Sequence, residues 1–297
     1  MHPSSQFATS NSDDLVPFSL SVWLARKQIS MTEFSNSTPS NEDQRRKIAS
    51  ILMTIFVLLI FVPLGVLGSA IEWPDNLSLG ADHNLPLLLE QKVSAFWGYF
   101  IYLLYSILFF PMGLMMAQTI ATDGTRNPNG SLVSIASGFA GLSALSRSIG
   151  LCRWLFAMPT LARIYVDPNT SEQTKEAVSV AYEMLNGWGG GIGEILGVSL
   201  FAAAFVICVS ILFIQSSKYP SWMGYLGFLV AIDLFLNLLE ASILDYNMGV
   251  NLTLAVVLLH FWIFGTVLLF LRCSPCCKKL VNDSDEGEGS TRHDSHV

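Results

Sequence analysis

The stretch IASILMTIFVLLIFVPLGVLGSAI, residues 48–71, decides the class of fold because it contains no charged side chain. A helix rises about 1.5 Å per residue, so about 20 apolar residues are enough to cross the hydrocarbon core of a bilayer, which is about 30 Å thick. A helix that is apolar on every side requires lipid or a large protein core around it. This stretch, directly preceded by Arg45-Arg46-Lys47, therefore predicts a transmembrane helix.

Five further apolar blocks follow in a chain of 297 residues that is 52% hydrophobic and only 13% charged. Soluble domains average about 25% charged residues, so this chain has too little polar surface for a water-soluble globule. The composition and the blocks together predict an all-α, polytopic membrane helix bundle, formed by residues 45–272. The six predicted spans are about 48–71, 93–118, 131–162, 184–215, 222–243 and 250–271.

The third predicted span, 131–162, differs from the others because it contains Arg147 and Arg153. A soluble interpretation would place an isolated apolar hairpin between two membrane segments, so we favour a span. Small residues recur every four positions from Ala136 to Ser148, which puts them on one helix face. Such a face allows a neighbouring helix to approach closely, although an ordinary alanine-rich helix has the same pattern.

The distribution of Lys and Arg predicts the orientation, because cytoplasmic loops retain these residues. With six spans and a cytoplasmic N-terminus, the outer loops hold only Lys92, Arg163 and Lys175. The inner segments hold Arg26, Lys27, Arg45, Arg46, Lys47, Arg126, Lys218, Arg272, Lys278, Lys279 and Arg292. Both termini are therefore predicted to lie in the cytoplasm, while the identity of the membrane stays open.

The two ends of the chain, residues 1–44 and 273–297, are predicted to be disordered cytoplasmic tails, because they are rich in small, polar and acidic residues. Cys273, Cys276 and Cys277 follow the last span on the cytoplasmic side. Cysteines in this position are candidate palmitoylation sites. Unmodified thiols remain an alternative, and half of a zinc site is a weaker one because no second pair of ligands accompanies it.

Glycosylation motifs of the form Asn-x-Ser/Thr are informative only where they face outwards. Of those in the chain, Asn76 and Asn169 fall in predicted outer loops. The pattern arises by chance often. Both residues are nevertheless the candidate glycosylation sites.

A glycine-rich stretch surrounds Glu194 between residues 187 and 197. Glycine-rich loops can cradle phosphate, but here no Lys-Ser/Thr follows and the stretch is predicted to face outwards, away from cytoplasmic nucleotides. Gly189, Gly193 and Gly197 recur every four residues, the spacing that lets helices touch in lipid. We therefore favour a helix-packing role for these glycines.

Ionisable residues inside the predicted spans are the main candidates for a functional site, because each one requires a partner or a water-lined cavity. Counting depth along the helices places them in three layers of opposite charge. The predicted polar cluster consists of Asp233 with His260 near mid-bilayer, Arg147 with Glu240 farther out, and Arg153 with Glu194 near the outer boundary. The cluster either braces the bundle or forms a polar path in which Asp233 and His260 exchange protons and the arginines bind an anionic group.

No motif predicts catalysis, a metal site, a cofactor or nucleic-acid binding. Metal-binding His-x-x-x-His spacing and the Gly-x-Ser-x-Gly elbow of hydrolases are both missing. The lipid bilayer is the one predicted partner. The favoured function is small-solute or proton-linked transport, a structural or regulatory membrane protein is the alternative, and an intramembrane enzyme is less favoured.

Residues 147–200 carry a family resemblance. The residues that carry it are Arg153-Trp154, Pro159, Leu161-Ala162-Arg163, Tyr165, Asp167-Pro168, Thr174, Glu176-Ala177-Val178, Gly193-Glu194 and Leu196-Gly197. In this region the chain resembles the multi-pass bacterial membrane proteins of domain-of-unknown-function family 4386. The resemblance implies a membrane protein and pairs Arg153 with Glu194 at the ends of adjacent spans, but it assigns no activity.

Overall fold

The computed structural model describes residues 39–124, 130–239 and 249–272. These residues are almost entirely helical, and no β-strand occurs in these three ranges. The chain divides into two compact units, Met1–Glu42 and Asp43–Val297, and the contacts described below lie within the second unit. The tail regions 1–38 and 273–297, together with Glu240, lie outside the described residues.

Within these three ranges the structure confirms the prediction of six helical regions that are long and apolar enough to cross a membrane. They are Asn41–Ile71, Lys92–Asp123, Gly130–Val166, Glu172–Gln215, Trp222–Leu239 and Thr253–Arg272. The third region, which contains both arginines, is the least apolar of the six but still meets the length and composition of a span.

Several of these regions consist of more than one helical element. The elements are α2 (Pro39–Leu59), α3 (Phe61–Ile71), η1 (Asp75–Ser78), α4 (Ala81–Glu90), α5 (Lys92–Gly124), α6 (Gly130–Cys152), η2 (Arg153–Ala157), α7 (Met158–Val166), α8 (Glu172–Gly190), η3 (Gly191–Phe201), α9 (Ala202–Gln215), α10 (Trp222–Leu239) and α11 (Gly249–Arg272). Two of them, η2 and η3, are π-helices, which are uncommon and often mark functional positions.

Two helices begin earlier than the apolar blocks indicate. Helix α2 starts at Pro39, before the domain boundary predicted at residue 45, and α8 starts at Glu172, well before the span predicted at 184. At the start of α8 the Ser171 hydroxyl accepts a hydrogen bond from the Thr174 backbone N–H at 3.3 Å. Such a polar cap starts a helix outside any apolar block, so hydropathy alone does not detect it.

Apolar side chains fill the core of the bundle and also form much of its outer surface. Ile51, Leu58, Phe61, Leu229 and Phe261 are each more than half exposed. A soluble monomer rarely exposes so much apolar surface. The polar side chains, in contrast, include several that are buried.

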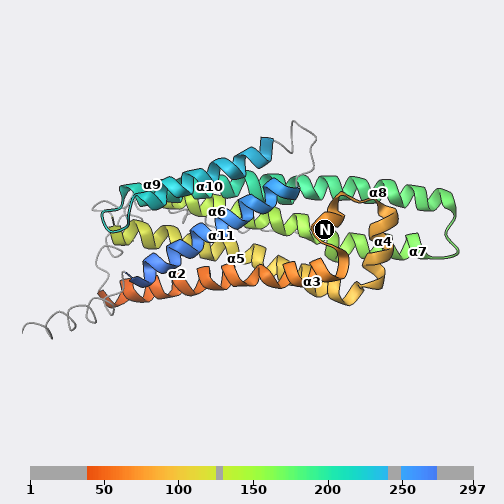
Figure 1. Ribbon diagram of the computed structural model, residues 1–297, viewed down its shortest axis with the longest axis horizontal. Coiled ribbons are helices and arrows are strands. Elements are labelled where there is room, and N and C mark those ends of the chain that lie inside the picture. Colours follow the sequence, from red (N-terminus) through yellow and green to blue (C-terminus); the bar gives the residue numbers. More distant parts are fainter. Residues whose placement is uncertain (1–38, 125–129, 240–248, 273–297) are drawn as a thin grey trace, which may run out of the picture. The chain divides into compact units, whose positions relative to one another are not determined.

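The centre of the second unit is a layer of long helices. Helix α5 packs against α6, and α6 packs against both η3 and α9. Figure 1 shows α8 and α9 as parts of one continuous helical run beside α6. This α6–η3 contact brings the predicted arginines and glycines together.

Candidate functional site

The contact between α6–η2 and α8–η3 joins the two arginines to the glycine repeat. The two runs are antiparallel. Residues spaced three apart on α6–η2 lie opposite residues spaced four apart on α8–η3. The facing pairs are Arg147 with Gly197, Gly150 with Gly193, and Arg153 with Gly189. The glycines and the arginines, which the sequence presents as separate features, form one interface.

Each glycine provides space that a side chain would fill. A Cβ atom on Gly189 would lie 2.5 Å from Arg153 Cδ, and one on Gly197 would lie 2.9 Å from Arg147 Cγ. Gly150 touches the opposite backbone, because its Cβ would lie 2.7 Å from the Gly193 Cα atom. The glycines therefore let the helix backbones touch and leave room for the two arginine stems.

Arg153 has an acidic partner. Its Nη2 atom lies 3.4 Å from Glu194 Oε1, and the two side chains are 7% and 24% exposed. Arg153 begins η2 and Glu194 lies in η3, so the pair joins the two π-helices. The structure thus brings together the outermost of the three pairs that the sequence indicates.

Arg147 is buried like Arg153, but it has no acidic partner within the described residues. The residue is 5% exposed, and its guanidinium carbon lies 4.5 Å from the centre of the Phe109 ring. Its Nε and Nη2 atoms are buried and lack a hydrogen-bond partner among the described residues, although the guanidinium interacts with the Tyr105 hydroxyl. Its predicted partner, Glu240, lies outside the described residues.

His260 lies in an aromatic group near Arg147. Its Nδ1 lies 2.6 Å from the Val256 carbonyl oxygen, which only accepts, so Nδ1 carries the hydrogen and donates it. In the neutral ring Nε2 then accepts, and the Tyr105 hydroxyl, 3.1 Å away, donates to it. Tyr105 and His260 also interact electrostatically with Arg147.

Asp233 and His260 do not form the mid-bilayer pair that depth counting indicates. Tyr105 and Val256 occupy both ring nitrogens of His260, and Asp233 Oδ2 is buried without a hydrogen-bond partner in the described part of the chain. Depth along a helix does not specify which way a side chain faces, which explains the error. One turn farther along α10, Asn237 Nδ2 donates to Ser199 Oγ at 2.6 Å.

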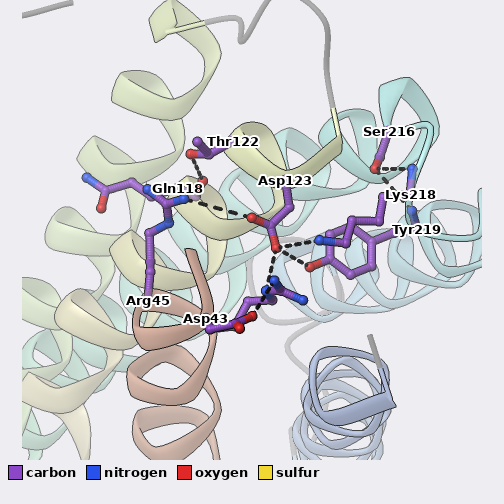
Figure 2. Close-up of polar contacts among 9 residues, drawn as sticks. Asp43, Arg45, Gln118, Thr122, Asp123, Ser216, Lys218 and Tyr219 are labelled. Atoms are coloured by element: carbon purple, nitrogen blue, oxygen red, sulfur yellow. Dashed lines mark hydrogen bonds and ion pairs between the residues drawn. The ribbon is translucent and has the colours of Figure 1, made fainter. Parts of the chain in front are cut away.

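A second polar cluster, which sequence reasoning missed, surrounds Asp123 at the other end of the bundle (Figure 2). The Asp123 side chain is fully buried, and its Oδ2 lies 3.0 Å from Arg46 Nε and 3.3 Å from Lys218 Nζ. The Tyr219 hydroxyl donates to the same oxygen at 2.9 Å. Arg45 Nη2 lies 3.8 Å from Oδ1.

This Asp123 cluster joins three parts of the chain. Arg45 and Arg46 come from α2, Asp123 from the end of α5, and Lys218 and Tyr219 from the α9–α10 connection. The sequence offered one signal, an acidic residue just after the second predicted span and near the basic inner segments. Basic residues in inner segments indicate orientation, and that pattern alone does not reveal the acidic residue that these cations share.

The remaining predicted sites differ in accessibility. Asn76 is 1% exposed, and its Nδ2 donates to Asn84 Oδ1 at 3.0 Å, so its amide is not accessible to a glycosylating enzyme. Asn169 is exposed. The structure therefore favours Asn169 over Asn76 as a glycan acceptor. Cys273, Cys276 and Cys277 lie outside the described residues.

Metal ligands do not gather in the described parts of the chain, where no group of three or more His, Cys, Asp or Glu side chains could hold an ion. The fold and the polar interior define a class: over the described residues, an all-helical protein with six helices long and apolar enough to cross a membrane. No family model, curated protein or solved structure matches the chain.

Proposed function

We propose that the chain crosses a lipid bilayer six times with both termini in the cytoplasm, and that it carries a small anionic solute past Arg147. The exposed apolar side chains on every long helix support insertion into lipid. Kinship with family 4386 is part of the same proposal, and it is supported by the contact between Arg153 and Glu194.

Arg147 is the observation that carries the solute proposal. A guanidinium stays protonated in proteins, and an uncompensated charge in the membrane interior is costly. The nearby Arg153 already has Glu194, whereas Arg147 has two buried nitrogens without a partner in the described residues. A small anion bound there would accept hydrogen bonds from both nitrogens and neutralise the charge.

Tyr105 and His260 give this site a group that can exchange a proton. The ring of His260 becomes a cation if Nε2 takes up a proton, and the Tyr105 hydroxyl then accepts instead of donating. A second positive charge beside Arg147 would strengthen anion binding. Anion movement would then be linked to proton movement.

A structural role is the second candidate, and the Arg153–Glu194 pair favours it. The two charges of that pair offset each other, and the pair lies where backbones touch through Gly150 and Gly193. In this alternative Arg147 in α6 and Arg153 in η2 hold these elements against η3, and Arg147 has its counter-ion in Glu240 or in another residue of the chain.

Uptake into liposomes tests the solute proposal. We expect the reconstituted protein to take up at least one of three labelled probes, phosphate, sulfate or succinate, faster than protein-free liposomes do. Arg147→Met should lower that uptake on the order of thirtyfold, because an anion loses its buried charged partner. Arg272→Met, which removes an exposed arginine at the end of α11, is the matched control and should retain uptake.

The structural alternative predicts a different result. Uptake of none of the three probes by folded protein, with equal loss of stability in Arg147→Met and Glu240→Gln, would assign Arg147 to an internal ion pair. The solute proposal would then be rejected.

The proposed topology has its own test. In a variant with all five cysteines replaced by serine, we introduce Asn169→Cys or Ser221→Cys, both at exposed positions. A membrane-impermeant maleimide should label Cys at position 169 in intact cells and Cys at position 221 only after permeabilisation. Labelling of both positions from the same side would contradict the six-span arrangement.

A further inference from the structure

A pocket of about 370 Å³ lies where the start of α5 meets η2 and α7. Its walls are largely apolar and aromatic, and its lining includes Phe96, Trp97, Trp154 and Leu155. Two cations, Lys92 and Arg163, complete the lining. A pocket of this size falls within the range that holds small ligands, or part of a larger one.

Lys92 and Arg163 differ from the third basic residue of the proposed outer loops, because they lack an ion-pair partner among the described residues. The proposed outer loops hold three basic residues, and the third, Lys175, forms an ion pair with Glu172 at 3.0 Å. Lys92 and Arg163 form no ion pair with a described residue. Both unpaired outer cations therefore converge on one pocket, although they lie far apart in the sequence.

Arg163 is oriented by its own helix. Its Nε donates to the Pro159 carbonyl oxygen at 3.1 Å. This bond engages one nitrogen and leaves the two terminal nitrogens of the guanidinium available for the forked contact that phosphate oxygens favour. Lys92, which is exposed at the start of α5, supplies a second charge to the same pocket.

The apolar part of the pocket is continuous with surface that faces outwards from the bundle. Val93 is 72% exposed, Trp97 53% and Phe96 48%. Tryptophan is enriched at membrane–water interfaces, where its ring spans apolar and polar surroundings. A ligand that matches this surface has an anionic head beside the cations and an apolar chain along the aromatic side chains.

We infer that this pocket binds one anionic phospholipid of the outer leaflet, with its phosphate between Lys92 and Arg163 and an acyl chain along Phe96 and Trp97. Charge complementarity and the apolar lining both favour a lipid over a free anion. The inference rests on the proposed insertion into a bilayer. It is independent of the solute site at Arg147, because it uses different residues.

Fluorescence quenching by brominated lipids tests the inference, because Trp97 lines the pocket. The protein is placed in nanodiscs of phosphatidylcholine that contain a small fraction of brominated phosphatidylglycerol or, separately, the same fraction of brominated phosphatidylcholine. The contribution of Trp97 is obtained by difference from Trp97→Phe. We expect the dose response to show a preference for phosphatidylglycerol on the order of tenfold, since each basic residue near the surface attracts anionic lipid appreciably.

The variants separate the pocket from general electrostatics. Lys92→Gln/Arg163→Gln should abolish the preference for phosphatidylglycerol while leaving quenching by phosphatidylcholine unchanged. The control Lys47→Gln/Lys175→Gln removes the same amount of charge outside the pocket and should retain the preference.

Each possible result has a distinct meaning. Quenching without lipid preference, or a preference that survives Lys92→Gln/Arg163→Gln, would overturn the lipid site and leave membrane insertion intact. Loss of the preference on adding millimolar inorganic phosphate would assign the pocket to a free anion and also overturn the lipid site. An absence of quenching by either lipid would contradict insertion itself.

Discussion

Replacing Asp123 by asparagine is expected to lower the free energy of unfolding by about 3–5 kcal/mol, because it removes the carboxylate from a buried group of cations. The Asp123 side chain is fully buried, and Arg46, Lys218 and Arg45 lie within 3.0, 3.3 and 3.8 Å of its oxygens. Asparagine keeps the shape and can still accept from Tyr219, but it leaves these cations without their shared counter-charge.

The expected loss is large because the cluster joins α2, α5 and the α9–α10 connection. Thermal unfolding of the detergent-solubilised protein should show a midpoint about 6 °C lower or more for Asp123→Asn. Glu176→Gln neutralises an exposed carboxylate in α8 and serves as the control. An equal midpoint for the two variants would show that solvent or another anion compensates the cations, and would contradict a stabilising role for this cluster.

Asp43 allows a second comparison within the same cluster. It accepts from Arg46 Nη2 at 2.6 Å, but its side chain is 25% exposed and it contacts one cation instead of three. Exposed ion pairs between residues one helix turn apart contribute only about 0.3–0.5 kcal/mol, and the Asp43–Arg46 pair is more buried than these but less buried than Asp123. A comparison of the two residues therefore separates two effects on the free energy of unfolding, that of burying a carboxylate and that of merely placing it near a cation.

The sequence predicted six spanning helices because uncharged length is a local property. Residues 48–71 can be predicted as a span without any knowledge of their neighbours. The third region, Gly130–Val166, shows how far this reasoning extends, because its two arginines did not prevent the prediction of a helix. Helix starts such as Glu172 were missed because polar caps lie outside the apolar blocks.

Contacts between helices were only partly predictable. Arg153 and Glu194 meet as the sequence suggested, because the two helical runs that carry them stay in close contact through Gly150 and Gly193. His260 instead contacts Tyr105, whose uncharged side chain gives no signal in a search for charged residues within the spans. The position of a residue along a helix gives the depth of its side chain. The direction in which the side chain points depends on how the helices pack, which the sequence of one helix does not determine.

Packing is restrictive at Gly150, where the three atoms nearest to an added Cβ are all backbone atoms, and its replacement is the other large expected effect. A Cβ atom there would lie 2.7 Å from the Gly189 carbonyl oxygen and 2.7 Å from Gly193 Cα. Both are backbone atoms, so α6 must move away from the end of α8 and the start of η3 to relieve the clash. We expect Gly150→Ala to lower the free energy of unfolding by about 1–3 kcal/mol, the usual cost of overpacking, and Gly150→Leu to prevent the contact altogether.

Gly187 provides a matched control with the opposite sign. It lies in α8, three residues before the helix end, and a Cβ atom there would meet nothing within 4 Å. Alanine is a better helix former than glycine by about 0.5–1 kcal/mol, so Gly187→Ala should be neutral or stabilising in thermal unfolding. If Gly150→Ala matched Gly187→Ala, the helices would have room to spare at Gly150. The facing pairs that place Arg147 and Arg153 against glycines would then not depend on close backbone contact, and the proposed anion site would lose its rigid frame.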